Sequence, residues 1–312
     1  MFNSIWEDVK QQFRFGNMVT RLIVINAFVF VAVNIVNLGF TVFQGFKQDT
    51  GFYDFVKFFS LSNDLFFDLT HPWVIITNMF LHVGFWHFLW NMLFLYWFGR
   101  IVGDLVGNHR ILPLYLLGGL AGGSIYLLTA NFIYSGESFA YGASAAVMAI
   151  VMASGTIAPD YNMRLILIGD VKLKYIVGVL IFLDLIGIAN LSNTGGHLAH
   201  LGGALFGFIF IRQLQSGQDW SEPVNNLVNR LEEFFTRLFS SNPKGPKVVY
   251  RSKDAKRKKH TPRAKGRAKS DTSAEATQAR IDEILEKIKK SGYESLTDEE
   301  KEFLFNASKE KD

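Results

Sequence analysis

The chain has 312 residues, of which 49% are hydrophobic and 15% aromatic, and it contains no cysteine. This composition excludes a disordered protein, a disulfide-stapled protein and a thiol nucleophile, and it favours a membrane protein. The formal net charge is only +4, but residues 243–270 hold twelve Lys and Arg against one acidic residue, so the basic character belongs to one segment.

The N-terminal part predicts an amphipathic segment, a membrane span and a folded loop. Apolar residues recur near helical spacing within 1–18, which we expect to be cytoplasmic and to lie at the membrane surface. The apolar run 19–43 is long enough to cross a hydrocarbon core of ~30 Å. Residues 44–85 are rich in aromatic residues but interrupted by polar ones, which predicts a loop partly embedded in the membrane interface.

Five further apolar segments predict an all-α, polytopic membrane protein with a bundle of six transmembrane helices over residues 19–214. These later spans are expected at 86–105, 110–131, 143–158, 174–191 and 196–214. Lys and Arg gather in alternate connections, and basic residues favour the cytoplasmic side of a membrane. Both termini are therefore expected in the cytoplasm.

The cytoplasmic tail divides into three parts. Residues 215–242 predict a juxtamembrane amphipathic helix, which either lies on the inner membrane surface or packs on a partner. Residues 243–274 predict a flexible linker, and its basic run 243–270 is expected to bind anionic lipid of the inner leaflet. Nucleic acid is not expected as a partner, because no aromatic platform or known motif accompanies the basic run. Residues 275–312 predict a small helical hairpin, whose second helix opens with a capping box at 297–300.

A nucleophile and a base are predicted at one depth in the bundle. Ser144 begins the fourth span and His200 lies about four residues into the sixth, so both fall within roughly 10 Å of the outer boundary. A serine beside a histidine supplies a nucleophile and its general base. Gly142 places Ser144 at a loop-to-helix junction, where free backbone N–H groups can stabilise an oxyanion. Gly203 and Gly207 share the helical face of His200 and predict close packing there.

Spacing alone leaves the roles of the remaining polar residues of the bundle open. Asp184 lies in the predicted fifth span, near its outer end, where it is expected to be either a catalytic partner or the partner of an interhelical or interfacial hydrogen bond, so a Ser–His dyad is the simplest hypothesis. Asn91 lies one turn after His87, and this pair can donate hydrogen bonds to an oxyanion. His82 is expected to be structural. A metal site is the rival hypothesis, with four candidate histidines: His82, His87, His197 and His200. Since neither an HExxH motif nor a nearby Glu base occurs, no metal and no cofactor are expected.

Three motifs in chain order resemble the rhomboid family of intramembrane serine proteases. They are His82-(4)-His87-(3)-Asn91, Gly142-Ala143-Ser144 and Ala199-His200-(2)-Gly203-(3)-Gly207. The resemblance covers residues 19–214 and implies that Ser144 is the nucleophile and His200 the general base. It also implies an oxyanion hole of Asn91, His87 and the Ser144 backbone N–H. The implied reaction is cleavage of transmembrane proteins near their outer end without a cofactor, in a bacterial cytoplasmic (inner) membrane.

The chain departs from the family pattern at three positions. Ala145 follows the serine where Gly is frequent, and Val74 follows Pro72-Trp73 where Arg is common. Met148 stands where some members have a tyrosine that stacks on the histidine, so His200 must be packed by Met148 or by another group. None of these changes removes a reacting group. The alternative is a catalytically inactive rhomboid-like binder of transmembrane segments, against which the intact Ser144 and His200 argue.

Overall fold

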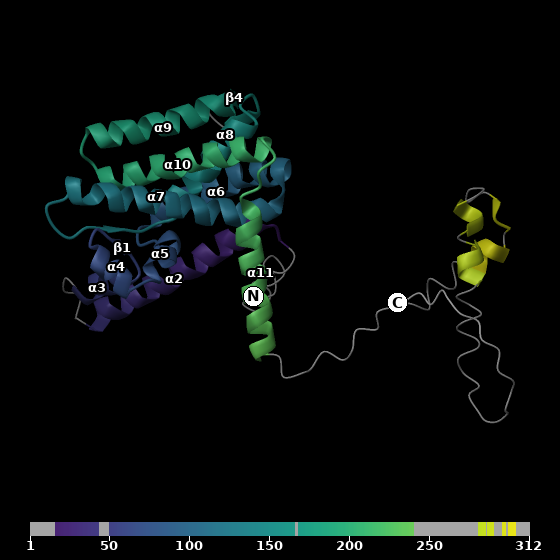
Figure 1. The fold of residues 1–312 in the computed structure, drawn as a ribbon, viewed down its shortest axis with the longest axis horizontal. Coiled ribbons are helices and arrows are strands. Elements are labelled where there is room, and N and C mark those ends of the chain that lie inside the picture. The colour runs from purple at the N-terminus through teal and green to yellow at the C-terminus, as the bar shows by residue number, and fades with distance from the viewer. Residues whose placement is uncertain are drawn as a thin grey trace, which may run out of the picture. The chain divides into compact units, whose positions relative to one another are not determined.

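The computed structural model describes residues 16–43, 50–165, 168–239, 280–284, 286–289, 295–297 and 299–303, and these are mostly helical (Figure 1). The chain divides into two compact units, residues 1–243 and 244–312. Most of the predicted segment 1–18 and all of the predicted basic run 243–270 lie outside the described residues.

Each of the six predicted spans coincides with one helix of the first unit. These helices are α2 (Met18–Phe43), α6 (Phe85–Val106), α7 (Ile111–Ile133), α8 (Ser144–Ile157), α9 (Leu173–Ala189) and α10 (Thr194–Gln215). Three described segments are long and apolar enough to cross a membrane, namely Met18–Phe43, Asn108–Ile133 and Thr194–Gln215. With α8 as a shorter apolar helix, this composition identifies a largely helical membrane protein.

Small residues on three helices allow α7, α8 and α10 to pack closely. A Cβ added at Gly122 of α7 would lie 2.5 Å from the Ala145 Cβ and from the Ala199 carbonyl oxygen. A Cβ at Gly203 or Gly207 of α10 would collide with the backbone of α8. Helices approach one another this closely in lipid when small residues line the contact. The contact brings the N-terminal half of α10 against the start of α8.

The predicted loop 44–85 contains several short elements, from residue 50 onward. They are α3 (Thr50–Phe58), β1 (Leu61–Ser62), α4 (Leu65–Thr70), α5 (Val74–Thr77) and the 3-10 helix η1 (Asn78–Phe80). Strand β1 pairs antiparallel with β2 (Phe139–Ala140), which lies in the connection between α7 and α8. This pairing joins two connections that are far apart in sequence.

The connection between α8 and α9 forms a hairpin where the sequence indicates only alternating apolar and polar residues. Its strands are β3 (Asn162–Leu165) and β4 (Gly169–Lys172), paired antiparallel with Leu165 opposite Gly169. Alternation with a period of two is the pattern of a strand with one covered face. Lys172 and Lys174 both contact Asp160 at the base of the hairpin, at 3.0 and 2.8 Å.

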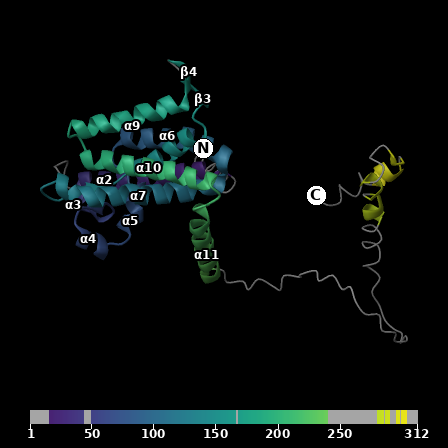
Figure 2. The same ribbon diagram turned by 45° about the horizontal axis from the view of Figure 1, so that its top comes forward.

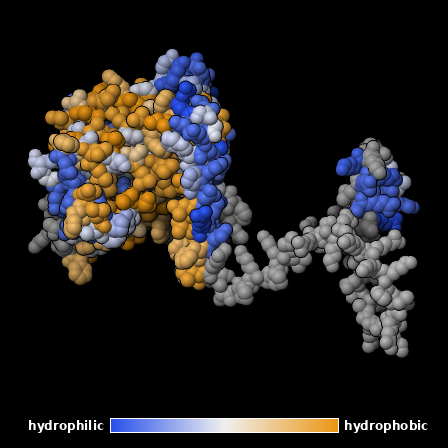
Figure 3. All heavy atoms as spheres, viewed as in Figure 1, coloured by the Kyte–Doolittle hydropathy of each residue, from blue (hydrophilic) through white to orange (hydrophobic). Residues whose placement is uncertain are grey.

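Helix α11 (Ser221–Phe239) runs across the direction of the bundle helices in both ribbon views (Figures 1 and 2). Its start is fixed by Arg110 of the 3-10 helix η2 (Asn108–Arg110), whose Nε donates a 2.8 Å hydrogen bond to Asp219. Burial raises the pKa of Asp219, but the bonds from Arg110 and Ser221 outweigh it and hold the pKa at about 2. In Figure 3 a hydrophilic band covers the end of the bundle that carries β4 and α11, beside a hydrophobic surface over the bundle.

The second unit shows parts of the predicted helical hairpin. Thr297 and Glu300 form reciprocal bonds, in which the Thr297 N–H donates to Glu300 at 2.8 Å and the Glu300 N–H donates to the Thr297 hydroxyl at 3.3 Å. This is the capping box that the sequence predicts at 297–300. Ile284 and Leu296 are buried, and Lys287 contacts Glu300 at 2.8 Å.

Candidate active site

A glycine turn delivers the chain to Ser144. Gly142 has a φ of +123°, a conformation that side-chain-bearing residues rarely adopt, and an added Cβ would lie 2.6 Å from Cε1 of His87. The Gly142 N–H donates to the Asn78 carbonyl at 2.8 Å. The conformation and the lack of space both require glycine here, and Ser144 follows as the first residue of α8.

His82 supports this turn from the connection before α6. The side chain is fully buried, its Nδ1 donates to the Phe80 carbonyl at 3.2 Å, and its Nε2 accepts the Ala143 N–H at 3.3 Å. Burial, and next the neighbouring charge of His87, lower the pKa of His82 to about 4, so the ring is neutral at physiological pH. The geometry gives His82 a structural position beneath the turn.

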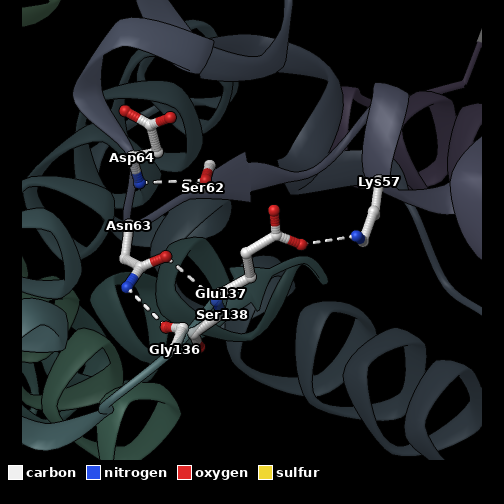
Figure 4. A network of polar contacts seen from close by, with 7 residues as sticks. All are labelled: Lys57, Ser62, Asn63, Asp64, Gly136, Glu137 and Ser138. Carbon is white, nitrogen blue, oxygen red and sulfur yellow. Dashed lines mark hydrogen bonds and ion pairs between the residues drawn. The ribbon is translucent and has the colours of Figure 1, made fainter.

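The connection between α7 and α8 is also fixed from its other side (Figure 4). The side chain of Asn63 donates to the Gly136 carbonyl at 3.0 Å and accepts the Ser138 N–H at 2.9 Å. Lys57 of α3 contacts Glu137 at 2.7 Å, and strand β2, which pairs with β1, begins two residues after Glu137. The loop from residue 50 onward therefore holds the chain that enters the site.

Ser144 and His200 line the same cavity, which has a volume of about 430 Å³. Ser144 comes from the start of α8 and His200 from the first half of α10. Other lining residues come from four parts of the chain: Asn78, His87, Tyr141, Gly142, Ala145 and Asn193. The cavity thus contains a serine hydroxyl, two imidazoles and the N-terminus of a helix, where backbone N–H groups lack intrahelical partners.

Asp184 of α9 lies between two histidines of α10. Its Oδ1 lies 2.8 Å from Nδ1 of His200 and 2.7 Å from Nδ1 of His197. Only His200 of these three residues lines the cavity. Spacing left the role of Asp184 open, although a carboxylate inside a span signals a polar partner and the two histidines share one face at i and i+3.

The same three side chains are also the metal-ligand group found among the described residues. Asp184, His197 and His200 offer one ligand atom each, all within 4.8 Å of one another. Two imidazoles and a carboxylate are a donor set that zinc accepts. The four histidines of the rival metal hypothesis therefore do not form one group, because His82 lies under the glycine turn and His87 lines the cavity.

Asn91 and Met148 are buried but do not line the cavity. The side chain of Asn91 donates to the His87 carbonyl one turn earlier, at 2.8 Å. Met148 packs in the main hydrophobic core. Contact with His200 comes instead from Asp184 and from the ring of His197, whose centroid lies 5.7 Å away. At position 145, where the resembled family frequently has Gly, the methyl group of Ala145 occupies the space left by Gly122.

Comparison with known proteins yields two family matches and several distant relatives. The rhomboid domain family matches residues 69–215, and a family of unknown function (DUF6576) matches residues 273–310. The chain is 30% identical over 139 residues to Presenilin-associated rhomboid-like protein A, mitochondrial, of Danio rerio, covering 44% of this chain and 36% of the relative. It is 33% identical over 153 residues to RHOMBOID-like protein 6, mitochondrial, of Arabidopsis thaliana, covering 48% and 47%.

A bacterial relative carries the word protease in its name. The chain is 30% identical over 137 residues to Rhomboid protease GluP of Bacillus subtilis, covering 44% of this chain and 25% of the relative. The chain therefore spans between a quarter and a half of the length of these three relatives. The match to the rhomboid domain includes the glycine turn, Ser144 and His200.

Proposed function

The chain belongs to the rhomboid family, and on this premise we propose that it is an intramembrane serine endopeptidase. It cleaves transmembrane proteins near the outer face of the membrane. One observation carries the proposal: Ser144, at the N-terminus of α8, and His200 line a single cavity. A nucleophile and a base that line one cavity with free backbone donors are the groups that acyl transfer requires.

The reaction begins when Nε2 of His200 accepts the proton of the Ser144 hydroxyl. The resulting alkoxide attacks the carbonyl carbon of a peptide bond, and the carbonyl oxygen becomes an oxyanion. His200 then gives its proton to the leaving amine as the C–N bond breaks, which leaves an acyl-enzyme. A water molecule, deprotonated by His200, attacks the acyl carbon, and the Ser144 oxygen leaves with the returned proton.

The oxyanion is stabilised from the start of α8. The Ser144 backbone N–H belongs to the first turn of the helix, whose donors have no intrahelical partner and carry the positive end of the helix dipole. His87 lines the cavity and is a second donor. Asn91 uses one N–H on the His87 carbonyl, and its carboxamide carries another that is the proposed third donor.

The proposed setting is a bundle of six spans in a bacterial cytoplasmic membrane with both termini inside. Ser144 and His200 then lie near the outer boundary, where water reaches them. A substrate helix must unwind locally to expose its backbone, so small or helix-weakening residues are expected near its outer end. On the inner side, α11 lies on the membrane surface and the basic run 243–270 binds anionic lipid. No cofactor is required.

Labelling with a fluorophosphonate probe tests the proposal on purified full-length protein. Wild type is expected to label and to cleave a generic transmembrane substrate, whereas Ser144→Ala and His200→Ala do neither. Ser124→Ala is the matched control, because that hydroxyl only donates to the Leu120 carbonyl of its own helix, at 2.9 Å. This control is expected to behave as wild type.

A folded wild-type protein that neither labels nor cleaves would contradict the proposal. Retained binding of a transmembrane segment would then favour the inactive rhomboid-like binder. Cleavage that survives Ser144→Ala but is abolished by a chelator would favour the metal group of Asp184, His197 and His200 instead.

A further inference from the structure

One carboxylate oxygen holds two imidazoles at the contact between α9 and α10. Oδ1 of Asp184 lies 2.8 Å from Nδ1 of His200 and 2.7 Å from Nδ1 of His197. The Asp184 side chain is only 8% exposed, while those of His197 and His200 are 23% and 20% exposed. A buried carboxylate inside a membrane helix is costly unless it is hydrogen-bonded, and here it has two donors.

The direction of these hydrogen bonds determines where each imidazole carries its proton. An ionised carboxylate only accepts hydrogen bonds, so Nδ1 is the protonated nitrogen of both rings. In a neutral imidazole the other nitrogen then keeps its lone pair. For His200, which lines the cavity with Ser144, this leaves Nε2 as the nitrogen that can accept the Ser144 proton.

His197 bonds to Asp184 without lining the cavity that holds Ser144. It lies one turn before His200 on α10 and does not line the cavity. Its ring packs on Gly187 of α9, where an added Cβ would lie only 2.5 Å from the ring carbon Cδ2. Gly187 is one turn after Asp184, so the glycine makes room for His197 to reach the carboxylate. The carboxylate is thus fixed by its own helix and by two rings of the next.

We propose that Asp184 is a positioning residue for His200 and that His197 secures Asp184. This inference rests on the proposed function and extends the Ser144–His200 dyad by a third group. Asp184 fixes the tautomer and the orientation of the His200 ring, and its negative charge stabilises the imidazolium that forms when Nε2 takes the Ser144 proton. No proton moves to Asp184, so the atoms and charges of the reaction are unchanged.

A purely structural role makes a different prediction from a positioning role. The hydrogen bond between Asp184 and His197 joins α9 to α10, so a change at either residue weakens the contact between the two helices. Both residues contact His200, but only Asp184 hydrogen-bonds its ring, at Nδ1, whereas His197 contacts it through ring packing. Asp184→Asn and His197→Gln are therefore a matched pair, in which both variants weaken the contact between the helices but only the first removes the carboxylate that bonds Nδ1 of His200.

The experiment measures cleavage of a transmembrane substrate by full-length protein in liposomes, with thermal unfolding recorded for every variant. Asp184→Asn is expected to lower kcat by about 100-fold or more with KM within about threefold of wild type. His197→Gln is expected to keep kcat within about tenfold. Asp184→Glu, which retains the carboxylate, is expected to recover part of the loss. Should Asp184→Asn fail to fold, the Glu variant takes its place, with a reduced kcat at unchanged KM as the expected result.

Two kinetic results would overturn the inference. One is an equal loss of kcat in Asp184→Asn and His197→Gln, and the other is a kcat within about threefold of wild type for the folded Asp184 variant. Nitrogen-15 NMR of histidine-labelled wild type gives a readout that does not depend on activity, with His200 expected to be protonated at Nδ1. Protonation at Nε2 in an active enzyme would overturn this inference but not the proposed function. A folded wild type that neither cleaves substrate nor reacts with the fluorophosphonate probe would contradict the proposed function itself.

Discussion

The backbone carbonyl of Ala145 occupies the space that a Cβ atom on Gly203 would need. The same relation recurs one turn further along, between Gly207 and the carbonyl of Ala149. α10 therefore runs against the backbone of α8 with no side chain between them. This contact sets the separation of the helices that carry His200 and Ser144.

Replacing Gly203 by Ala is expected to disrupt the site. The added methyl group would force α10 away from α8, because a backbone carbonyl cannot move aside as a flexible side chain does. Overpacking of this kind costs about 1–3 kcal/mol or more. We expect Gly203→Ala to lose fluorophosphonate labelling and to unfold at a lower temperature than wild type.

The control for this change is Gly178→Ala in α9. Gly178 has no atom near its added Cβ within 4 Å, and alanine is the better helix former. This variant is expected to keep both labelling and thermal stability. Equal behaviour of the two variants would contradict the role given to the contact between Gly203 and Ala145.

The sequence predicts the helices and the close-packing faces well, because both depend on local periodicity. The small residues at Gly122, Gly203 and Gly207 predict which faces approach, and the glycine before Ser144 predicts a turn. The position of Asp184 does not follow from spacing, since it depends on how α9 is placed against α10. The elements within the loop from residue 50 are equally non-local, because β1 is formed with a partner almost eighty residues away.

His82 predicts a specific dependence of stability on pH. Its pKa is about 4 in the folded protein against an ordinary value of 6.5, so unfolding takes up a proton between these values. The free energy of unfolding should therefore fall as pH is lowered from 6.5 to about 4, by up to about 3 kcal/mol, and the loss is complete below pH 4. Unfolding in detergent across this range measures the slope.

His82→Gln provides the comparison for this effect. The Gln side-chain oxygen can still accept the Ala143 N–H, but it does not titrate. We expect this variant to show a shallower slope between pH 6.5 and 4, because the other six histidines are present in both proteins. Identical slopes for wild type and His82→Gln would show that His82 is not buried in its neutral form.

The proposed orientation predicts which connections face the outside of the cell. The chain has no cysteine, so a single introduced cysteine is the only thiol. Ser135 lies in the connection between α7 and α8, Asn162 lies in the hairpin between α8 and α9, and both are exposed. A membrane-impermeant maleimide should label Ser135→Cys in intact cells and Asn162→Cys only after permeabilisation. The reverse pattern would place Ser144 near the inner face.

Helix α11 predicts a membrane-surface segment on the inner side of the bundle. It runs across the bundle helices, and its exposed large apolar residues recur at helical spacing: Leu227, Leu231, Phe234, Phe235 and Leu238. Such a helix buries its apolar face in the headgroup region when it lies in the membrane plane. Residues 227–238 would then contact lipid while the opposite face stays in water.

An environment-sensitive fluorophore on single cysteines distinguishes the two faces of α11. Leu231→Cys and Asn229→Cys lie on opposite sides of the helix, and both positions are exposed. In liposomes that contain anionic lipid, we expect a blue-shifted emission for the label at position 231 and a water-like emission at 229. If α11 instead packs on a partner protein, both labels should give a water-like emission in liposomes of the purified chain, because that partner is absent from the sample.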